Sequence, residues 1–345
     1  MLAAGLVLLA ALPAAAGARR QDRLLLARPY PIEAAPSFPG GLFHWMDSLA
    51  GTTVGKTVPA HREEYLRLFG ALSGEDRAHL EAFVAARAEH VSRQAADAAR
   101  RDIPPRASAM LGVFCGSATV EDALAALKPE LTPVAWHGLA KALAHFRPRY
   151  EVVWNDGAVP QAFLERARRD PGRWQLEALL ARIVRFYGVD PLKASPPRLA
   201  LVPVPAGFGT HAEAIGGVLL LEIRKGETLA DEASVVVHEN AHFLWGLVPE
   251  ERRRRLALFA AGLDDGGARA FRLFGEAIPT ALGQGVADRA FRPSAWSPDG
   301  PWYHTPDVDA CAKRIYPIVR DALAAGLTLD EGLVLRAIRA SDGPR

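Results

Sequence analysis

The segment His238-Glu239-Asn240-Ala241-His242 holds residues of the types and spacing that a catalytic metal requires. On an α-helix, positions i and i+4 lie one above the other, so both imidazoles project from one face. Such a pair can bind one Zn²⁺ through two ring nitrogens, while the glutamate beside them takes a proton from water at the metal. The motif therefore predicts metal-assisted hydrolysis, with His238 and His242 as zinc ligands and Glu239 as general base.

The residues around this motif predict that it lies within a helix. Thr228 and Asp231 fit a capping box just before the apolar run at 235–237. Two histidines and a glutamate are costly to bury in an apolar stretch without a strong partner, and a metal ion supplies one. The alternative is a buried helix whose two histidines bond to backbone groups or water.

A catalytic zinc site usually has three protein ligands and one open position. Trp245 and Val248 stand where a metzincin has its glycine and its third histidine, so that class is excluded. Glu276 is the strongest candidate for an acidic third ligand, because it is the only acid between Asp265 and Asp288 and its stretch is apolar.

Small residues surround Glu276 and would let its helix pack closely on the motif helix. They are Gly275, Ala277, Ala281 and Gly283. The alternative roles of Glu276 are an ion pair with Arg272 and a side chain that reaches the surface.

A helix with H-E-x-x-H, followed roughly 30 residues later by a helix bearing Glu276-Ala277, resembles the gluzincin branch of the zincin metallopeptidases. The resemblance covers about residues 197–320 and implies a zincin-like fold and peptide-bond hydrolysis. It also implies His238, His242 and Glu276 as ligands of one zinc per chain, and Glu239 as general base and acid.

One position departs from the pattern of the thermolysin-like gluzincins. These have an aspartate one turn after the glutamate ligand, which supports a ligand histidine, whereas this chain has Thr280. The polar partner of the histidines must then come from another part of the chain, or be replaced by a carbonyl or water.

Zincins also place an antiparallel edge strand above the zinc, with which a substrate peptide can pair. The β-like run 217–223, bounded by glycines, is the candidate, and 198–203 predicts another strand. The glycine-rich loop 207–211 lies between them. The alternative is an ordinary hairpin packed on a helix.

The loop 301–307 contains two candidates for a donor to the developing oxyanion, Tyr303 and His304. Tyrosine and histidine commonly serve this purpose, and the loop follows Glu276 in the chain. The alternative is a surface loop with ordinary aromatic packing.

The composition limits the partners. Lys+Arg at 41 against Asp+Glu at 39 gives a net charge of +2, which argues against nucleic acid or an acidic membrane as the main partner. The expected partner is a peptide or protein substrate. The alternative function is a non-catalytic exported protein that binds zinc or peptides in a degenerate zincin cleft.

The N-terminus predicts export. Residues 2–18 carry no charge, include the apolar run 6–12 and end in small residues before Arg19. This pattern predicts a signal peptide over 1–18 and a periplasmic or secreted protein without stable membrane insertion afterwards. An uncleaved anchor is the alternative, although the run is short for a bilayer span.

The expected fold is α+β and mostly helical. A helical N-terminal region, 19–190, precedes a zincin-like metallopeptidase domain, 191–345, with a small antiparallel or mixed sheet. Residues 28–55 are expected to form an irregular arm. The predicted helices are roughly 60–70, 74–99, 120–128, 133–145, 172–187, 306–325 and 329–340.

The histidines of the N-terminal half show no ligand spacing, so structural or exposed roles are expected for each. They are His44, His61, His79, His90, His137 and His145. Cys115 and Cys311 could form one long-range disulfide, and two buried free thiols are equally consistent with the sequence.

Overall fold

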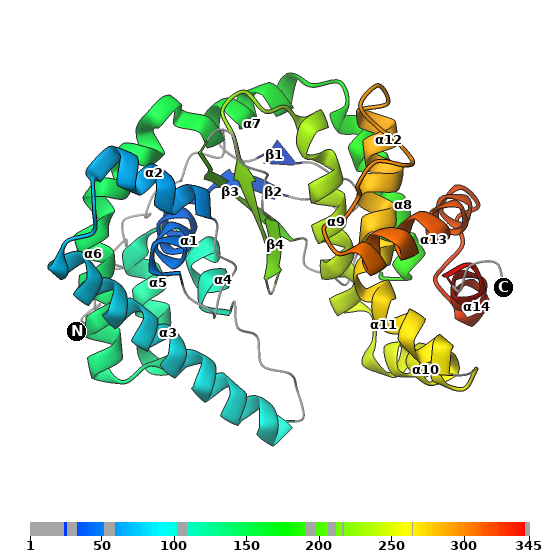
Figure 1. The fold of residues 1–345 in the computed structure, drawn as a ribbon, viewed down its shortest axis with the longest axis horizontal. Helices are drawn as coiled ribbons and strands as arrows, with labels where there is room; N and C mark the ends of the chain where they lie inside the picture. Colours follow the sequence, from blue (N-terminus) through cyan, green and yellow to red (C-terminus); the bar gives the residue numbers. More distant parts are fainter. Residues whose placement is uncertain are drawn as a thin grey trace, which may run out of the picture.

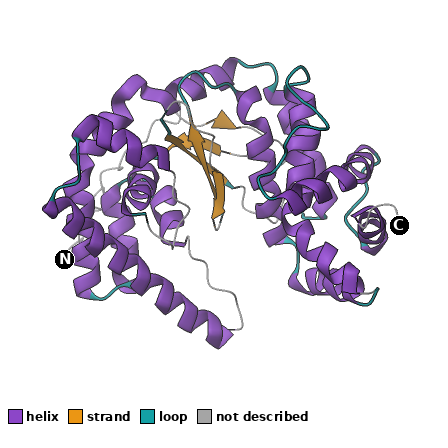
Figure 2. Cartoon of the chain, in the orientation of Figure 1, coloured by secondary structure: helices purple, strands orange, loops and turns teal. Residues whose placement is uncertain are grey.

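A computed structural model describes residues 24–25, 33–51, 59–101, 109–190, 197–205, 212–215, 217–263 and 265–341. The chain is mostly helical and is built around one small sheet, as predicted (Figures 1 and 2). The expected signal peptide, 1–18, lies outside the described residues and stays a prediction. Within the described part, no helix has the length and apolar character needed to cross a membrane.

Within the described residues, the sheet is mixed and contains five strands in the order β1-β2-β3-β5-β4. Strand β2 is parallel to β3 and β3 is parallel to β5, whereas β1 and β4 run antiparallel to their neighbours. The strands are β1 (Leu24–Leu25), β2 (Glu33–Pro36), β3 (Arg198–Pro203), β4 (Ala212–Ile215) and β5 (Val218–Ile223).

Helices of the N-terminal half cover one face of this sheet, and their core includes Ala200, Val202, Val218 and Leu220 from β3 and β5. In Figure 1 they are blue to green. They are α1 (Phe38–Ala50), α2 (Pro59–Phe69), α3 (Gly74–Arg101), α4 (Ala109–Gly116), α5 (Val120–Leu127) and α6 (Pro133–Asn155), with the short 3₁₀ segments η2 (Lys128–Glu130) and η3 (Asp156–Ala158).

The remaining helices contribute to a second core, which includes Leu199, Leu201, Leu219 and Leu221 on the other face of the sheet. They are α7 (Val159–Arg169), α8 (Arg173–Tyr187), α9 (Leu229–Leu247), α10 (Glu250–Ala261), α11 (Asp265–Thr280), the π-helical segment η4 (Ala281–Ala287), α12 (Asp288–Phe291), α13 (Pro306–Ala324) and α14 (Glu331–Ser341). Because side chains alternate along a strand, β3 and β5 contribute to both cores, and their residues are apolar apart from Arg198 and Glu222.

The expectation that residues 28–55 form an irregular arm is wrong for most of the described part of this segment. It forms β2, which pairs with β3, and the buried helix α1. Its prolines and glycines indicated a loop, but Pro39 lies in the first turn of α1, where its missing N–H costs nothing. Gly41 faces the Tyr150 hydroxyl, which a Cβ would overlap, so this glycine permits close packing.

The expectation that the run 217–223 forms an edge strand is also wrong. The run 217–223 forms β5 inside the sheet, between β3 and β4, and the strand beside α9 is β4. Strands β3 and β5 are parallel, so the hairpin alternative is wrong as well. The sequence Ala-Glu-Ala-Ile of β4 has weak strand propensity, which is why it gave no signal. The glycine-rich loop 207–211 lies outside the described residues.

Pairing of β2 with β3 joins the expected N-terminal region to the expected C-terminal domain through a shared sheet. The two cysteines do not form the possible disulfide. Both are free and buried, Cys115 in the core on one face of the sheet and Cys311 in the core on the other.

Candidate metal centre

Helix α9 positions the H-E-x-x-H motif. The predicted capping box is present at its start: the Thr228 backbone N–H donates to Asp231 Oδ2 at 2.9 Å, and the Asp231 N–H donates to Thr228 Oγ1. The buried residues Val236, Val237 and Ala241 belong to the core that also contains Leu199 and Leu219 of the sheet. The imidazoles of its two histidines lie next to the Glu276 carboxylate of α11.

Helix α11 and segment η4 pack closely on α9. A Cβ added at Gly283 would lie 2.5 Å from the Ser234 carbonyl oxygen and 3.1 Å from His238 Cβ. A side chain there would therefore separate η4 from α9. Segment η4 is π-helical, a geometry that is frequent at functional sites.

The packing of α11 and η4 on α9 brings the three expected metal ligands together. His238 Nε2 and His242 Nε2 are 3.1 Å apart, and Glu276 Oε2 lies 3.6 Å from the first and 3.3 Å from the second. Zinc bonds of about 2.0–2.1 Å at tetrahedral angles place ligand atoms about 3.3 Å apart. The three atoms therefore have the separations that one zinc ion requires.

The surroundings of Glu276 favour its deprotonated carboxylate, which is the form that binds a metal ion. Burial alone would raise its pKa, but the bonds from His238 and His242 outweigh burial and hold the pKa well below its usual range. His238 Nδ1 and the Thr280 hydroxyl are buried and have no hydrogen-bond partner within the described residues. Thr280 therefore does not replace the aspartate of the thermolysin-like pattern by bonding to His238.

Tyr303 is at this site. Its hydroxyl donates to Glu276 Oε2 at 3.0 Å, and its ring lies nearly parallel to that of His238, at 12° and 6.1 Å. Asp309 holds the loop, because its Oδ1 accepts from the backbone N–H groups of Trp302 and Tyr303. His304 is exposed and its ring lies 4.4 Å from that of Tyr303.

A cleft of about 440 Å³ opens onto these residues. Strand β4 borders it with Ala212 to Ala214, and α9 borders it with Val235 and Glu239. The Glu239 side chain thus faces the same space as the candidate ligands. Two imidazoles, a carboxylate, a further carboxylate and a phenol around one cleft can bind a divalent metal and move protons next to it.

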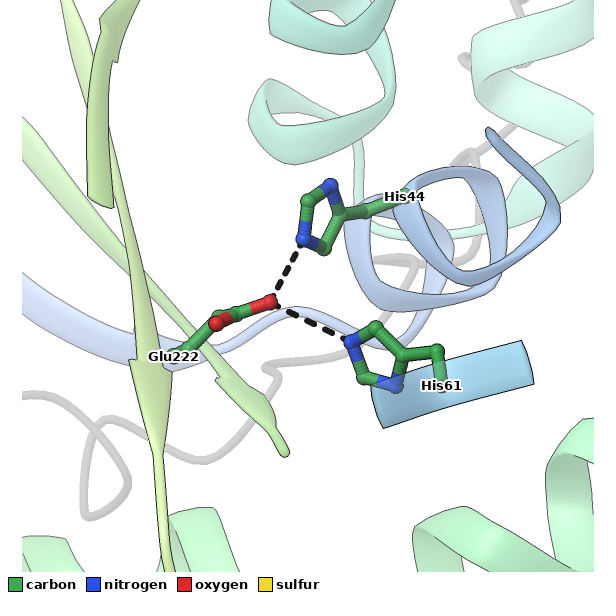
Figure 3. Close-up of side chains that lie close together, drawn as sticks. All are labelled: His44, His61 and Glu222. Carbon is green, nitrogen blue, oxygen red and sulfur yellow. Dashed lines mark hydrogen bonds and ion pairs between the residues drawn. The ribbon is translucent and has the colours of Figure 1, made fainter. Parts of the chain in front are cut away.

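The structure contains a second histidine–glutamate cluster that the sequence analysis missed. His44 on α1, His61 on α2 and Glu222 on β5 are buried and lie within metal-ligand distance of one another (Figure 3). Burial lowers the pKa of His61. Burial would raise that of Glu222, but the bonds from both imidazoles outweigh it and lower that pKa.

Histidine spacing carried no signal for this cluster, because its members come from three separate segments. Glu222, however, is a lone acid in the apolar run 217–223, and the argument that singled out Glu276 applies to it equally. A third group, Glu75, His79 and His145, lies toward the surface.

Comparisons of the chain with protein-family models, with curated proteins and with solved structures gave no match.

Proposed function

We propose that the chain is a metal-dependent hydrolase. The observation that carries this proposal is the arrangement of His238, His242 and Glu276 at tetrahedral separations, with Glu239 on the same cleft. A site of three ligands without cysteine that opens onto a cleft is typical of catalytic rather than structural zinc. Bound there, zinc would lower the pKa of water toward 7 and polarise a carbonyl group.

The residues of the chain have distinct roles in this proposal. Glu239 accepts a proton from the attacking water and passes it to the leaving group. Tyr303 donates its phenolic proton in a hydrogen bond to the oxyanion that develops on the substrate carbonyl. Glu276 and the two histidines hold the metal.

Within this class, we propose a zinc peptidase of the gluzincin type. Strand β4 supports a peptide substrate, because it is the last strand of the sheet and borders the cleft beside the metal centre. An extended peptide can add to such an edge through main-chain hydrogen bonds. The signal-peptide pattern of residues 1–18 supports export as the location of this activity.

The test is peptide hydrolysis by the zinc-loaded chain on a fluorogenic peptide library. Glu239→Gln is expected to keep the metal content of the wild type and to lose activity by about 10²–10⁴-fold, since general acid–base catalysis contributes that much. The matched control is Glu251→Gln, an exposed glutamate on α10. Full activity in Glu239→Gln would refute the assignment of the base.

The second candidate function is the non-catalytic zinc- or peptide-binding protein. The carboxylate of Glu239 on the cleft favours the hydrolase, because a structural site needs no base. A hydroxamate that raises the melting temperature of the zinc-loaded chain would indicate an open metal position. Hydroxamate binding without any peptide hydrolysis would favour the second candidate.

A further inference from the structure

The side chains of three buried residues converge on the face of the sheet that the N-terminal helices cover (Figure 3), and none of them lines the cleft. His44 Nε2 lies 2.7 Å from Glu222 Oε1, and His61 Nε2 lies 3.2 Å from the same oxygen. The two imidazole rings are perpendicular, with centroids 5.6 Å apart. The three side chains therefore direct their polar atoms at one point.

Glu222 occupies a position where a carboxylate is costly. It lies on β5, inside the sheet, and shares its face with Val218 and Leu220, which belong to the apolar core of the N-terminal helices. Its exposed fraction is 0%, and those of His44 and His61 are each 1%. A buried carboxylate needs a charged or strongly polar partner.

The donor set and its geometry suit a metal ion. All three ligand atoms lie within 4.8 Å of one another, as do those of His238, His242 and Glu276. The 3.2 Å separation of His61 Nε2 from Glu222 Oε1 is close to the tetrahedral value of about 3.3 Å. His44 Nε2, at 2.7 Å, would move outward by about 0.6 Å on metal binding.

Two other histidine–carboxylate groups lack this combination. His145 lies beside the Arg149 guanidinium, 3.4 Å away, which would repel a cation, and its cluster with Glu75 and His79 is toward the surface. His90 is buried and bonds to Glu130 at 2.8 Å, but among the described residues no second imidazole joins this pair. His90 therefore provides a matched control.

We propose that His44, His61 and Glu222 bind a second divalent cation, with zinc the best fit to two imidazoles and a carboxylate. Because the site is closed to solvent, its role is structural: it joins α1 and α2 to strand β5. Helix α2 has three buried residues, Ala60, His61 and Tyr65, so His61 is one of the few side chains that hold this helix in the core. Metal binding would stabilise the folded state through this link.

The test measures zinc per chain after reconstitution and removal of loosely bound metal. Wild type and the control His90→Gln are expected to hold about two zinc ions, whereas His61→Gln and the double variant His238→Gln/His242→Gln hold about one each. Glutamine in place of His61 keeps a hydrogen-bond donor near Nε2 but is a poor zinc ligand. A double variant without zinc, or His61→Gln with the zinc content of the wild type, would overturn the proposal.

Thermal unfolding of the double variant adds a readout that does not require His61→Gln to fold. A strong chelator is expected to lower the melting temperature of the double variant by several degrees, and no change would refute a structural metal. The double variant lacks the motif histidines, so its retained zinc is independent of the proposed hydrolase. If the proposed hydrolase function is wrong, the zinc-loaded wild type will instead fail to hydrolyse peptides.

Discussion

At the scale of single residues, the candidate metal centre depends on the environment of Tyr303. Burial is the main reason that the pKa of the Tyr303 phenol is raised to about 12. The charge of Glu276, the hydrogen bond from the phenol to this carboxylate and the charge of Glu239 raise the pKa further. At neutral pH the phenol of the metal-free chain therefore keeps its proton. This is the state in which it can donate to an oxyanion.

We expect Tyr303→Phe to lower kcat for peptide hydrolysis by about 10²–10³-fold, because loss of one oxyanion donor has that effect. Zinc content should not change, since the hydroxyl is not one of the proposed ligands. Steady-state kinetics and metal analysis check both points. Tyr316→Phe is the matched control, because Tyr316 bonds to Arg289 in the core, and unchanged kcat in Tyr303→Phe would exclude the role.

At the scale of elements, the first turn of helix α9 contains a buried acid, Glu232, that lies next to a second acid, Glu227. Glu232, in its first turn, is buried, and burial together with the adjacent Glu227 raises the pKa of Glu232 to about 9. The folded pKa therefore lies above the unfolded value of 4.5. The stability from this group is fully present below pH 4.5 and is lost as the pH rises toward 9.

We expect Glu232→Gln to remove this pH dependence, because the amide does not titrate and can still donate to Glu227. The variant should match the wild type near pH 4.5 and be more stable at pH 7, by at most about 3 kcal/mol. Urea unfolding at both pH values measures the difference. The control Glu81→Gln, at an exposed position on α3, should show no such trend, and a Glu232→Gln curve parallel to the wild type would contradict the expectation.

The contact between η4 and α9 makes a second prediction at this scale. Gly283→Ala is expected to destabilise the fold by about 1–3 kcal/mol and to weaken zinc binding, because its Cβ would press on the Ser234 carbonyl and His238. Gly275→Ala, in α11 with open space around it, should be neutral or stabilising by up to about 1 kcal/mol. Denaturation and zinc titration compare the two. Equal behaviour of both variants would show that the close packing does not matter.

At the scale of the whole molecule, the sheet separates two helical cores, and the clusters that contain His44 and His238 lie on opposite sides of it. His44, His61 and Glu222 lie on the side of the N-terminal helices, and the H-E-x-x-H motif lies on α9 on the other side. The cysteines follow the same division, because Cys115 and Cys311 belong to different cores. Burial raises the pKa of both thiols, that of Cys311 to about 11.

We expect neither thiol to react with a thiol reagent in the native chain, and about two thiols to react in denaturant without reductant. A reductant should leave the melting temperature unchanged, since no cross-link is lost. Absence of reactive thiols in denaturant until reductant is added would instead demonstrate a disulfide. An oxidising buffer should not change the expectation, because Cys115 and Cys311 belong to cores on opposite faces of the sheet.

The sequence by itself determined the features that depend on local periodicity. The capping box of Thr228 and Asp231, the shared face of His238 and His242, and the lone acid Glu276 all follow from helix geometry and from the cost of burying charge. The proximity of the three candidate ligands was predictable for that reason.

Only the tertiary structure decided the contacts between distant segments. Glu222 meets His44 and His61 across 178 and 161 residues, and β4 rather than β5 forms the edge of the sheet. Helix α1 forms from a stretch rich in proline and glycine because its close contacts are with the sheet and neighbouring helices. Which segments meet depends on how the whole chain buries its apolar surface, and no short stretch of sequence contains that information.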